Sequence, residues 1–334
     1  MTATANSISI VMFDDQNERQ SKAELLEEQT GFTVQFVDLQ NKEVIKEVEQ
    51  AIAEFTTPKM VLVDHILDKA IADSVIHKGT SIVPLLREQW PNAPIIAVTA
   101  AYEDCVNDIN SEVYEDVIPI EWFSRFVAYV PTVIGGYDEL TQMPHDMDSL
   151  FSLMNVPDSE TEAIRTSVPS AMKRRDGEPS FSHRVFRWFR RSFYRKPGFL
   201  LDRAWTALTV GVAKEHLSRY EDRILEAQYG GVFADPDDPR WWKARLYEYL
   251  LPDSRQRFSV SLCEAAKARL KISDSHASKC YRCGEKWPEV MGFVDESTVN
   301  ETAAEPLHLR CSRSDARFTS EPFYEERRVM LDDE

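Results

Sequence analysis

The sequence predicts an α/β domain with a doubly wound parallel sheet, followed by an all-helical domain and a small cysteine-containing end. The first part of this prediction rests on three apolar runs, which lie at residues 8–13, 59–64 and 94–99. Runs of this length, with polar groups only at their ends, are typical of strands buried on both faces of a parallel sheet. Helical patterns at 18–29 and 80–90 separate the runs, so strands and helices alternate as right-handed parallel connections require.

Weaker patterns complete the first domain. A further strand is expected at 33–37, and apolar residues recur at helical spacing over 44–55. A fifth strand is expected at 115–119 and a last helix at 121–130. The segment that follows contains prolines, a Gly-Gly pair and many polar side chains, which favours a linker. The expected organisation is a first domain at 7–130, a linker at 131–179, a helical domain at 180–274 and a small C-terminal domain at 275–325.

Polar side chains stand at the ends of three predicted strands. Asp14 and Asp15 follow the first, Asp64 ends the third, and Thr99 ends the fourth. The C-terminal ends of parallel strands meet at one edge of the sheet, where open α/β sheets bind their ligands. We therefore expect these four side chains to converge there. For Asp14 or Asp15 taken singly, a helix N-cap or a solvated loop residue is the alternative.

In order and approximate spacing, this acidic pair, single aspartate and threonine resemble the receiver domain of bacterial response regulators. The resemblance covers residues 1–125 and nothing beyond. It implies a receiver or flavodoxin-like fold in which Asp14, Asp15 and Asp64 bind Mg2+. It also implies that Asp64 accepts a phosphoryl group and that Thr99 contacts that group. Mg2+ suits such a site, because it prefers a few carboxylates together with water and a phosphoryl oxygen.

The sequence departs from this family at the end of the fifth strand. In the family a lysine precedes the proline that ends this strand, whereas Ile118 occupies that place here. An apolar side chain can neither neutralise a phosphoryl group nor donate a hydrogen bond to it. Lys69 and Lys78, on the loop after Asp64, are the alternative cations. We therefore expect a degenerate receiver, a pseudo-receiver.

The charge distribution points to one basic segment in an acidic protein. The formal net charge of −17 argues against a general nucleic-acid coat. Residues 173–196 nevertheless hold nine Lys or Arg against two acids, and part of this segment forms an amphipathic helix with a basic face. That face carries Arg184, Arg187, Arg191 and Arg195. A nucleic acid, another partner, or the chain's own acidic domain would each complement it.

Cysteines and histidines near the C-terminus predict a metal site. Cys280 and Cys283 are separated by two residues, as are His308 and Cys311. Two such pairs fit a tetrahedral, zinc-ribbon-like Zn2+ site, with His276 as the alternative fourth ligand. Four protein ligands leave no open position, so the zinc would be structural. Three free thiols and an unrelated histidine are the alternative.

The function expected from these features is not catalytic. No residue set resembles a nucleophilic triad, a phosphate-binding glycine loop or a zinc-hydrolase helix, so an enzyme is the less favoured class. The sequence favours a signalling or scaffold protein of a bacterial regulatory or defence system, in which the pseudo-receiver and the helical and zinc-binding parts bind protein partners. The alternative is a phosphorylation-dependent response regulator whose basic helix binds nucleic acid. No apolar run reaches the length of a membrane span and no signal peptide precedes the domain, so a cytoplasmic location is expected.

Overall fold

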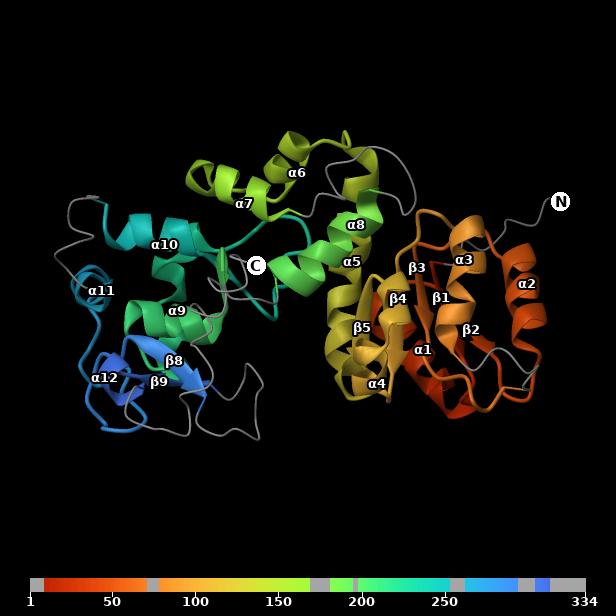
Figure 1. The fold of residues 1–334 in the computed structure, drawn as a ribbon, viewed down its shortest axis with the longest axis horizontal. Coiled ribbons are helices and arrows are strands. Elements are labelled where there is room, and N and C mark those ends of the chain that lie inside the picture. The colour runs from red at the N-terminus through yellow and green to blue at the C-terminus, as the bar shows by residue number, and fades with distance from the viewer. Residues whose placement is uncertain are drawn as a thin grey trace. The chain divides into compact units, whose positions relative to one another are not determined.

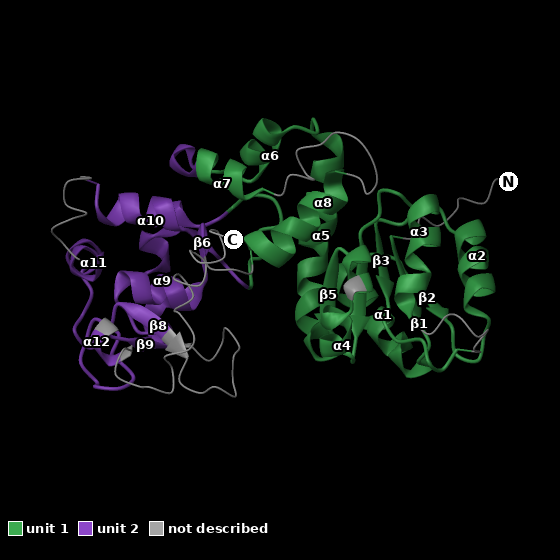
Figure 2. Cartoon of the chain, viewed as in Figure 1, with its two compact units in different colours: residues 1–156, 161–196, 230–237 green, residues 157–160, 197–229, 238–334 purple. Residues whose placement is uncertain are grey.

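The chain forms two compact units in the computed structural model (Figure 2). Unit 1 comprises residues 1–156, 161–196 and 230–237, and unit 2 comprises residues 157–160, 197–229 and 238–334. The structure describes residues 9–70, 78–168, 181–194, 198–252, 262–293 and 304–312. The predicted basic-face residue Arg195 and residues 169–179, at the end of the expected linker, lie outside these ranges.

Unit 1 is built on a five-stranded sheet in which all neighbouring strands are parallel (Figure 1). The strand order is β2-β1-β3-β4-β5, which is the order of flavodoxin-like doubly wound folds. The strands are β1 (Ile10–Asp14), β2 (Val34–Asp38), β3 (Met60–Val63), β4 (Ile95–Thr99) and β5 (Asp116–Pro119). The predicted fold class is therefore confirmed. All five residues of β1 and β4 are buried, as their unbroken apolar runs predict.

Helices cover both faces of this sheet, as its two-sided burial requires. They are α1 (Gln20–Thr30), α2 (Val44–Glu54), α3 (Val83–Gln89), α4 (Tyr102–Asn107) and α5 (Phe123–Gln142). Buried residues of α2, α3 and α4 share one core cluster with alternate residues of the strands, such as Val61 and Val63. Leu62 points to the opposite face, because successive strand side chains alternate. There α1 packs against α5.

Helix α5 is longer than the sequence predicts. We expected a helix at 121–130 and then a linker, but α5 continues through Pro131 to Gln142. Apolar residues on one face of this extension are buried, which compensates for the backbone hydrogen bond that the proline removes: Val133, Ile134, Tyr137 and Leu140. Gly136 is also required, because a Cβ there would lie 2.5 Å from the ring of Phe233.

The helix-rich segment after α5 also belongs largely to unit 1. It contains α6 (Met147–Leu153), α7 (Thr161–Ser167) and α8 (Phe181–Trp188), and α8 continues into a π-helical turn, Phe189–Phe193. The aromatic residues of this last helix face the same unit, since the rings of Phe186 and Phe189 lie 4.7 and 5.3 Å from that of Phe233. The compact unit thus extends well past the boundary expected at 130, and it includes the start of the expected helical domain.

Unit 2 combines short helices with two small antiparallel ribbons. Its helices are α9 (Arg203–Val210), α10 (Lys243–Leu250), α11 (Leu262–Leu270) and α12 (Leu309–Ser312). Strand β6 (Leu200–Leu201) pairs with β7 (Trp241–Trp242), and β8 (Val290–Phe293) pairs with β9 (Ala304–Leu307). Residues 214–227 form short 3-10 turns: Lys214–Arg219, Glu221–Arg223 and Leu225–Ala227. Within the described ranges of both units, no helix combines the length and apolar character needed to cross a membrane.

Candidate functional sites

Three buried carboxylates meet at the C-terminal edge of the sheet. Asp14 ends β1, Asp15 follows it, and Asp64 follows β3, the strand that pairs with β1. Each offers a carboxylate oxygen within 4.8 Å of the others, and none is more than 2% exposed. The parallel register explains this convergence, because Phe13 and Val63 are paired and the chain leaves both strands on the same side. A group of this kind can hold a cation.

One guanidinium group lies between two of these carboxylates. Nη1 of Arg19 is 2.9 Å from Oδ2 of Asp14 and 2.7 Å from Oδ2 of Asp64. Arg19 ends a 3-10 turn, Asn17–Arg19, between β1 and α1, and it is only 8% exposed. This role of Arg19 is not predicted from the sequence. An arginine at the start of an amphipathic helix usually faces solvent, so nothing in the sequence distinguishes it.

Burial controls the ionisation of the acidic group. Burial raises the pKa of Asp64 to about 7, the charge of Asp14 adds to the rise, and Arg19 opposes it. Burial likewise raises the pKa of Asp14 to about 6 against the effect of Arg19. Oδ2 of Asp15 accepts a hydrogen bond from the backbone N–H of Lys69 at 2.5 Å. Among the described residues, Oδ1 of Asp15 and Oδ1 of Asp64 have no hydrogen-bond partner and are buried.

The other receiver-like positions lie on the neighbouring strands. Thr99 ends β4, and its hydroxyl oxygen accepts a hydrogen bond from the backbone N–H of Ala101 at 3.1 Å. Ile118 lies in β5 opposite Val98 and is 4% exposed. Of the two alternative cations, Lys78 pairs with Asp108 on the helix-connecting segment after α4. Within the described part of the chain, the cation paired with Asp64 is therefore Arg19.

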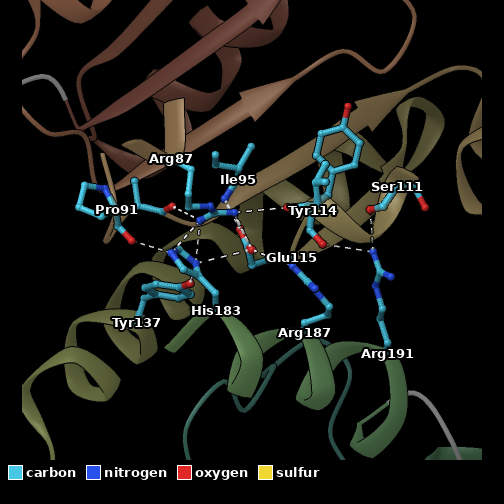
Figure 3. A network of polar contacts seen from close by, with 12 residues as sticks. Arg87, Pro91, Ile95, Ser111, Tyr114, Glu115, Tyr137, His183, Arg187 and Arg191 are labelled. Atoms are coloured by element: carbon cyan, nitrogen blue, oxygen red, sulfur yellow. Dashed lines mark hydrogen bonds and ion pairs between the residues drawn. The ribbon is translucent and has the colours of Figure 1, made fainter. Parts of the chain in front are cut away.

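The basic face of α8 contacts buried groups of its own unit (Figure 3). Nη2 of Arg187 is 3.4 Å from Oε1 of Glu115, just before β5. Nη2 of Arg191 donates to the backbone carbonyls of Ser111 and Tyr114, each at 3.2 Å. Arg184 is half-buried on the same helix. Of the three interpretations of the basic helix, these contacts match the one in which it complements the chain's own acidic domain.

Glu115 is the centre of this polar network. Its carboxylate accepts two hydrogen bonds from Arg87, at 2.7 and 2.9 Å, and one from the backbone N–H of Ile95 at 2.6 Å. His183 on α8 lies beside it, with Nδ1 3.6 Å from Oε1 of Glu115. One nitrogen of Arg87, Nη2, contacts both carboxylate oxygens, and this charge-assisted contact together with the backbone donor satisfies the fully buried carboxylate. Neither Glu115 nor Arg87 is predicted from the sequence to have a role, since their partners come from distant segments.

His183 is held as a neutral imidazole. Nε2 lies 2.6 Å from the backbone carbonyl of Pro91, which can only accept, so Nε2 carries the proton. Nδ1 then has a single lone pair, which can accept the hydroxyl of Tyr137. Nη1 of Arg87 lies beside the ring, 2.8 Å from Nδ1 and 2.7 Å from Nε2. Burial lowers the pKa of His183, and Arg87 lowers it further, whereas Glu115 opposes both effects.

The cysteines and histidine near the C-terminus also form a cluster. Cys280 and Cys283 precede β8, and His308 and Cys311 follow β9, so the antiparallel ribbon brings the two pairs together. Their ligand atoms all lie within 4.8 Å of one another. His276 is elsewhere, with Nδ1 2.7 Å from the hydroxyl of Tyr220. The structure thus selects His308 over His276 as the fourth member of the cluster.

The chemistry of this cluster suits a metal ion. Burial alone would raise the pKa of Cys280, but the backbone N–H groups of Cys283, His308 and Arg282 outweigh it and lower that pKa to about 6. Nε2 of His308 lies 3.0 Å from the carbonyl of Lys286, which fixes the proton on Nε2 and leaves Nδ1 free, 3.3 Å from Sγ of Cys283. Burial raises the pKa of the Cys311 thiol to about 11, so this side chain would lose its proton on binding a metal. Three cysteines and one imidazole oriented by such an outer hydrogen bond match the ligand types of structural Zn2+ sites.

Comparisons with known proteins find similarity in fold only. No protein-family model matches the chain, and no curated protein matches it. A CheY-like receiver domain protein from Methanospirillum hungatei is 18% identical over 40% of this chain and 96% of its own, with a TM-score of 0.30. A LuxR-family response regulator from Aurantimonas is 16% identical over 38% of this chain and 85% of its own, with a TM-score of 0.30. NtrX from Brucella abortus is 13% identical over 48% of this chain and 33% of its own, with a TM-score of 0.33. At these values the fold assignment rests on the strand order and register of unit 1.

Proposed function

We propose that the chain is a non-enzymatic signalling or scaffold protein whose receiver-like sheet domain serves as a protein-interaction module that does not depend on phosphorylation. The observation that supports this proposal is the environment of Asp64. Its carboxylate is paired with Arg19, and the strand end that would supply a second cation presents Ile118 instead.

The electrostatics of the acidic site oppose a stable phosphoaspartate. A phosphoryl group on Asp64 would place additional negative charge beside Asp14 and Asp15, which are buried. Such a group requires fixed cations or hydrogen-bond donors aimed at its oxygens. Nη1 of Arg19 already bridges two carboxylates, and Lys78 is paired with Asp108. Lys69 is the other nearby cation, since its charge opposes the rise in the pKa of Asp15. The cation paired with Asp64 itself is Arg19, which Asp14 already shares.

Phosphoryl transfer to the purified full-length chain tests this proposal. The protein is incubated with Mg2+ and acetyl phosphate, quenched in acid and measured by intact-protein mass spectrometry, beside an Asp64→Asn variant and an active receiver as a positive control. We expect no adduct on the wild-type chain under conditions that label the control receiver. An adduct that is present in the wild type and absent from Asp64→Asn would overturn the proposal.

We further propose that the C-terminal cluster binds a structural Zn2+ ion. The supporting observation is the convergence of Cys280, Cys283, His308 and Cys311 with a proton-bearing Nε2 on the histidine. Four protein ligands exclude substrate from the ion, so its role would be to hold the β8–β9 ribbon and the turn before it. Metal analysis of the purified chain tests this assignment. The Cys280→Ser, Cys283→Ser double variant should lose zinc, whereas Cys263→Ser, outside the cluster, should retain it.

The alternative function, a nucleic-acid-binding output, rests on the basic helix. Two of its arginines, Arg187 and Arg191, already contact Glu115 and backbone carbonyls of unit 1. We therefore expect no salt-dependent shift of DNA or RNA in a gel at low ionic strength. A shift that weakens steeply with salt and is lost in an Arg187→Ala, Arg191→Ala variant would support the alternative function instead.

A further inference from the structure

We propose that Arg19 is the resident cation of the acidic site and competes with divalent cations for Asp14 and Asp64. This inference rests on the proposed function and deepens it, because it assigns the site a cation supplied by the chain itself. The sheet domain would then keep its fold without a bound metal, and Mg2+ would bind only when the Arg19 side chain leaves.

The contacts of Arg19 show why both cations cannot use the site together. One nitrogen, Nη1, lies 2.7 Å and 2.9 Å from Oδ2 of Asp64 and of Asp14. A Mg2+ ion that used these two oxygens would need them at about 2.0–2.1 Å in near-octahedral geometry. Both positions fall in the same space between the two carboxylates. Two neighbouring positive charges in a buried site would also repel each other.

The remaining carboxylate oxygens show that the site retains the capacity to bind a metal. Oδ1 of Asp15 and Oδ1 of Asp64 are buried and have no hydrogen-bond partner among the described residues. Three carboxylates face one guanidinium, so the group keeps an excess of negative charge when all three are ionised. Unpaired, buried carboxylate oxygens of this kind are the ligands that a hard divalent cation prefers. The three carboxylates can thus bind a divalent metal ion, and in this structure the guanidinium of Arg19 occupies the position of that ion.

Displacement of Arg19 requires rotation of its side chain and is energetically unfavourable. The residue ends a 3-10 turn directly before α1, and rotation about its side-chain bonds leaves that backbone in place. The acid beside it keeps its place, since Oδ1 of Asp14 also accepts the backbone N–H of Gln16 at 2.8 Å. Rotation breaks two charge-assisted contacts in a buried site. The apparent affinity for a divalent cation is the intrinsic affinity multiplied by the fraction of molecules in which the Arg19 side chain has moved away.

Calorimetric titration of the full-length chain with Mn2+ and with Mg2+ tests the competition. We compare the wild type with Arg19→Met, which keeps a side chain of similar length without charge. Lys46→Met is the matched control, because Lys46 carries the same charge at a site that is 72% exposed. We expect Arg19→Met to bind Mn2+ and Mg2+ at least on the order of tenfold more tightly than the wild type does. Lys46→Met should bind both ions as tightly as the wild type does. Equal binding by wild type and Arg19→Met, or no binding by either, would overturn the inference.

Arg19→Met leaves buried carboxylates without their cation, so a second variant covers a failure to fold. Arg19→Gln removes the charge, while its amide nitrogen can still donate hydrogen bonds to a carboxylate. If Arg19→Met does not fold, Arg19→Gln decides: tighter metal binding than the wild type supports the competition, and unchanged metal binding refutes it. The two proposals fail separately. Tight Mg2+ binding by the wild type without a phosphoryl adduct refutes only the competition, whereas weak Mg2+ binding with an adduct on Asp64 refutes only the proposed function.

Discussion

Replacing Arg190 by methionine tests whether the basic helix is an integral part of unit 1. Nε of Arg190 donates to Oδ2 of Asp116 at 2.8 Å, and the two side chains are 11% and 2% exposed. The guanidinium also lies over the ring of Tyr129, 4.7 Å from its centroid. Asp116 lies in β5, so this pair joins the π-helical turn after α8 to the sheet. Methionine preserves most of the aliphatic packing and removes the charge.

The expected loss of stability follows from the burial of the pair. Removing one partner of a buried ion pair leaves the other charge uncompensated, which costs about 3–5 kcal/mol. The matched control is Arg165→Met, because Arg165 pairs with Asp148 at 2.6 Å but the two side chains are 38% and 85% exposed. A surface pair of this kind contributes about 0–1 kcal/mol. Combining Arg190→Met with Asp116→Asn should cost less than the sum of the two, by about 0.5–3 kcal/mol.

Hydrogen exchange measured by mass spectrometry in a urea series provides the free energy of unfolding of unit 1 in each variant. The chain has two compact units, so a single unfolding transition of the whole protein would mix them. Peptides from β5 and α8 report the opening of the relevant unit directly. We expect both peptides to lose protection together in Arg190→Met. If Arg190→Met costs no more than Arg165→Met, or if only the α8 peptide responds, the helix is not integral to the unit.

Further predictions concern single residues. The folded pKa of His183 lies below its ordinary value of 6.5, so the unfolded chain takes up the proton first. The free energy of unfolding of unit 1 should therefore fall as pH drops below 6.5 and be fully present above it. His183→Gln should make this fall shallower when hydrogen exchange of peptides from unit 1 is measured at each pH. His308→Ala should release zinc in a metal assay, whereas His276→Ala should keep it. Gly79→Ala should destabilise unit 1 by about 1–3 kcal/mol, since its Cβ would overlap the backbone carbonyl of Asp64. At Gly135 a Cβ meets nothing within 4 Å, so Gly135→Ala should be neutral or stabilising by about 0.5–1 kcal/mol. Hydrogen exchange of peptides from unit 1 in a urea series measures both changes.

The elements that could be predicted are those specified by local pattern. Strands β1, β3 and β4 are continuous apolar runs, as expected for strands whose side chains are buried on both faces of a parallel sheet. The meeting of Asp14, Asp15 and Asp64 follows from parallel strand ends alone. The spacing of the two ligand pairs predicts the Cys/His cluster. The structure was needed to bring the two pairs together and to choose between His308 and His276.

The features that could not be predicted depend on contacts between distant segments. Pro131 and the Gly-Gly pair resemble a helix end locally, but α5 continues because Phe233, about a hundred positions later, packs against Gly136. The partners of the basic helix, Glu115 and Asp116, lie some seventy residues away. Arg19 is the least predictable of these residues. The path of the chain after β1 places it between two carboxylates, and no periodic pattern in the sequence indicates that position.

The central claim is that the sheet domain works without a phosphorylation switch, and the response of the full-length chain to a phosphoryl mimic tests it most directly. Hydrogen exchange is measured by mass spectrometry with Mg2+ alone and with Mg2+ plus beryllium fluoride, using Asp64→Asn as the control. The account predicts equal exchange in the peptides that contain Asp64, Thr99 and α4 under the two conditions. Protection of these peptides by beryllium fluoride in the wild type, and its loss in Asp64→Asn, would show a working phosphoryl switch and contradict the account.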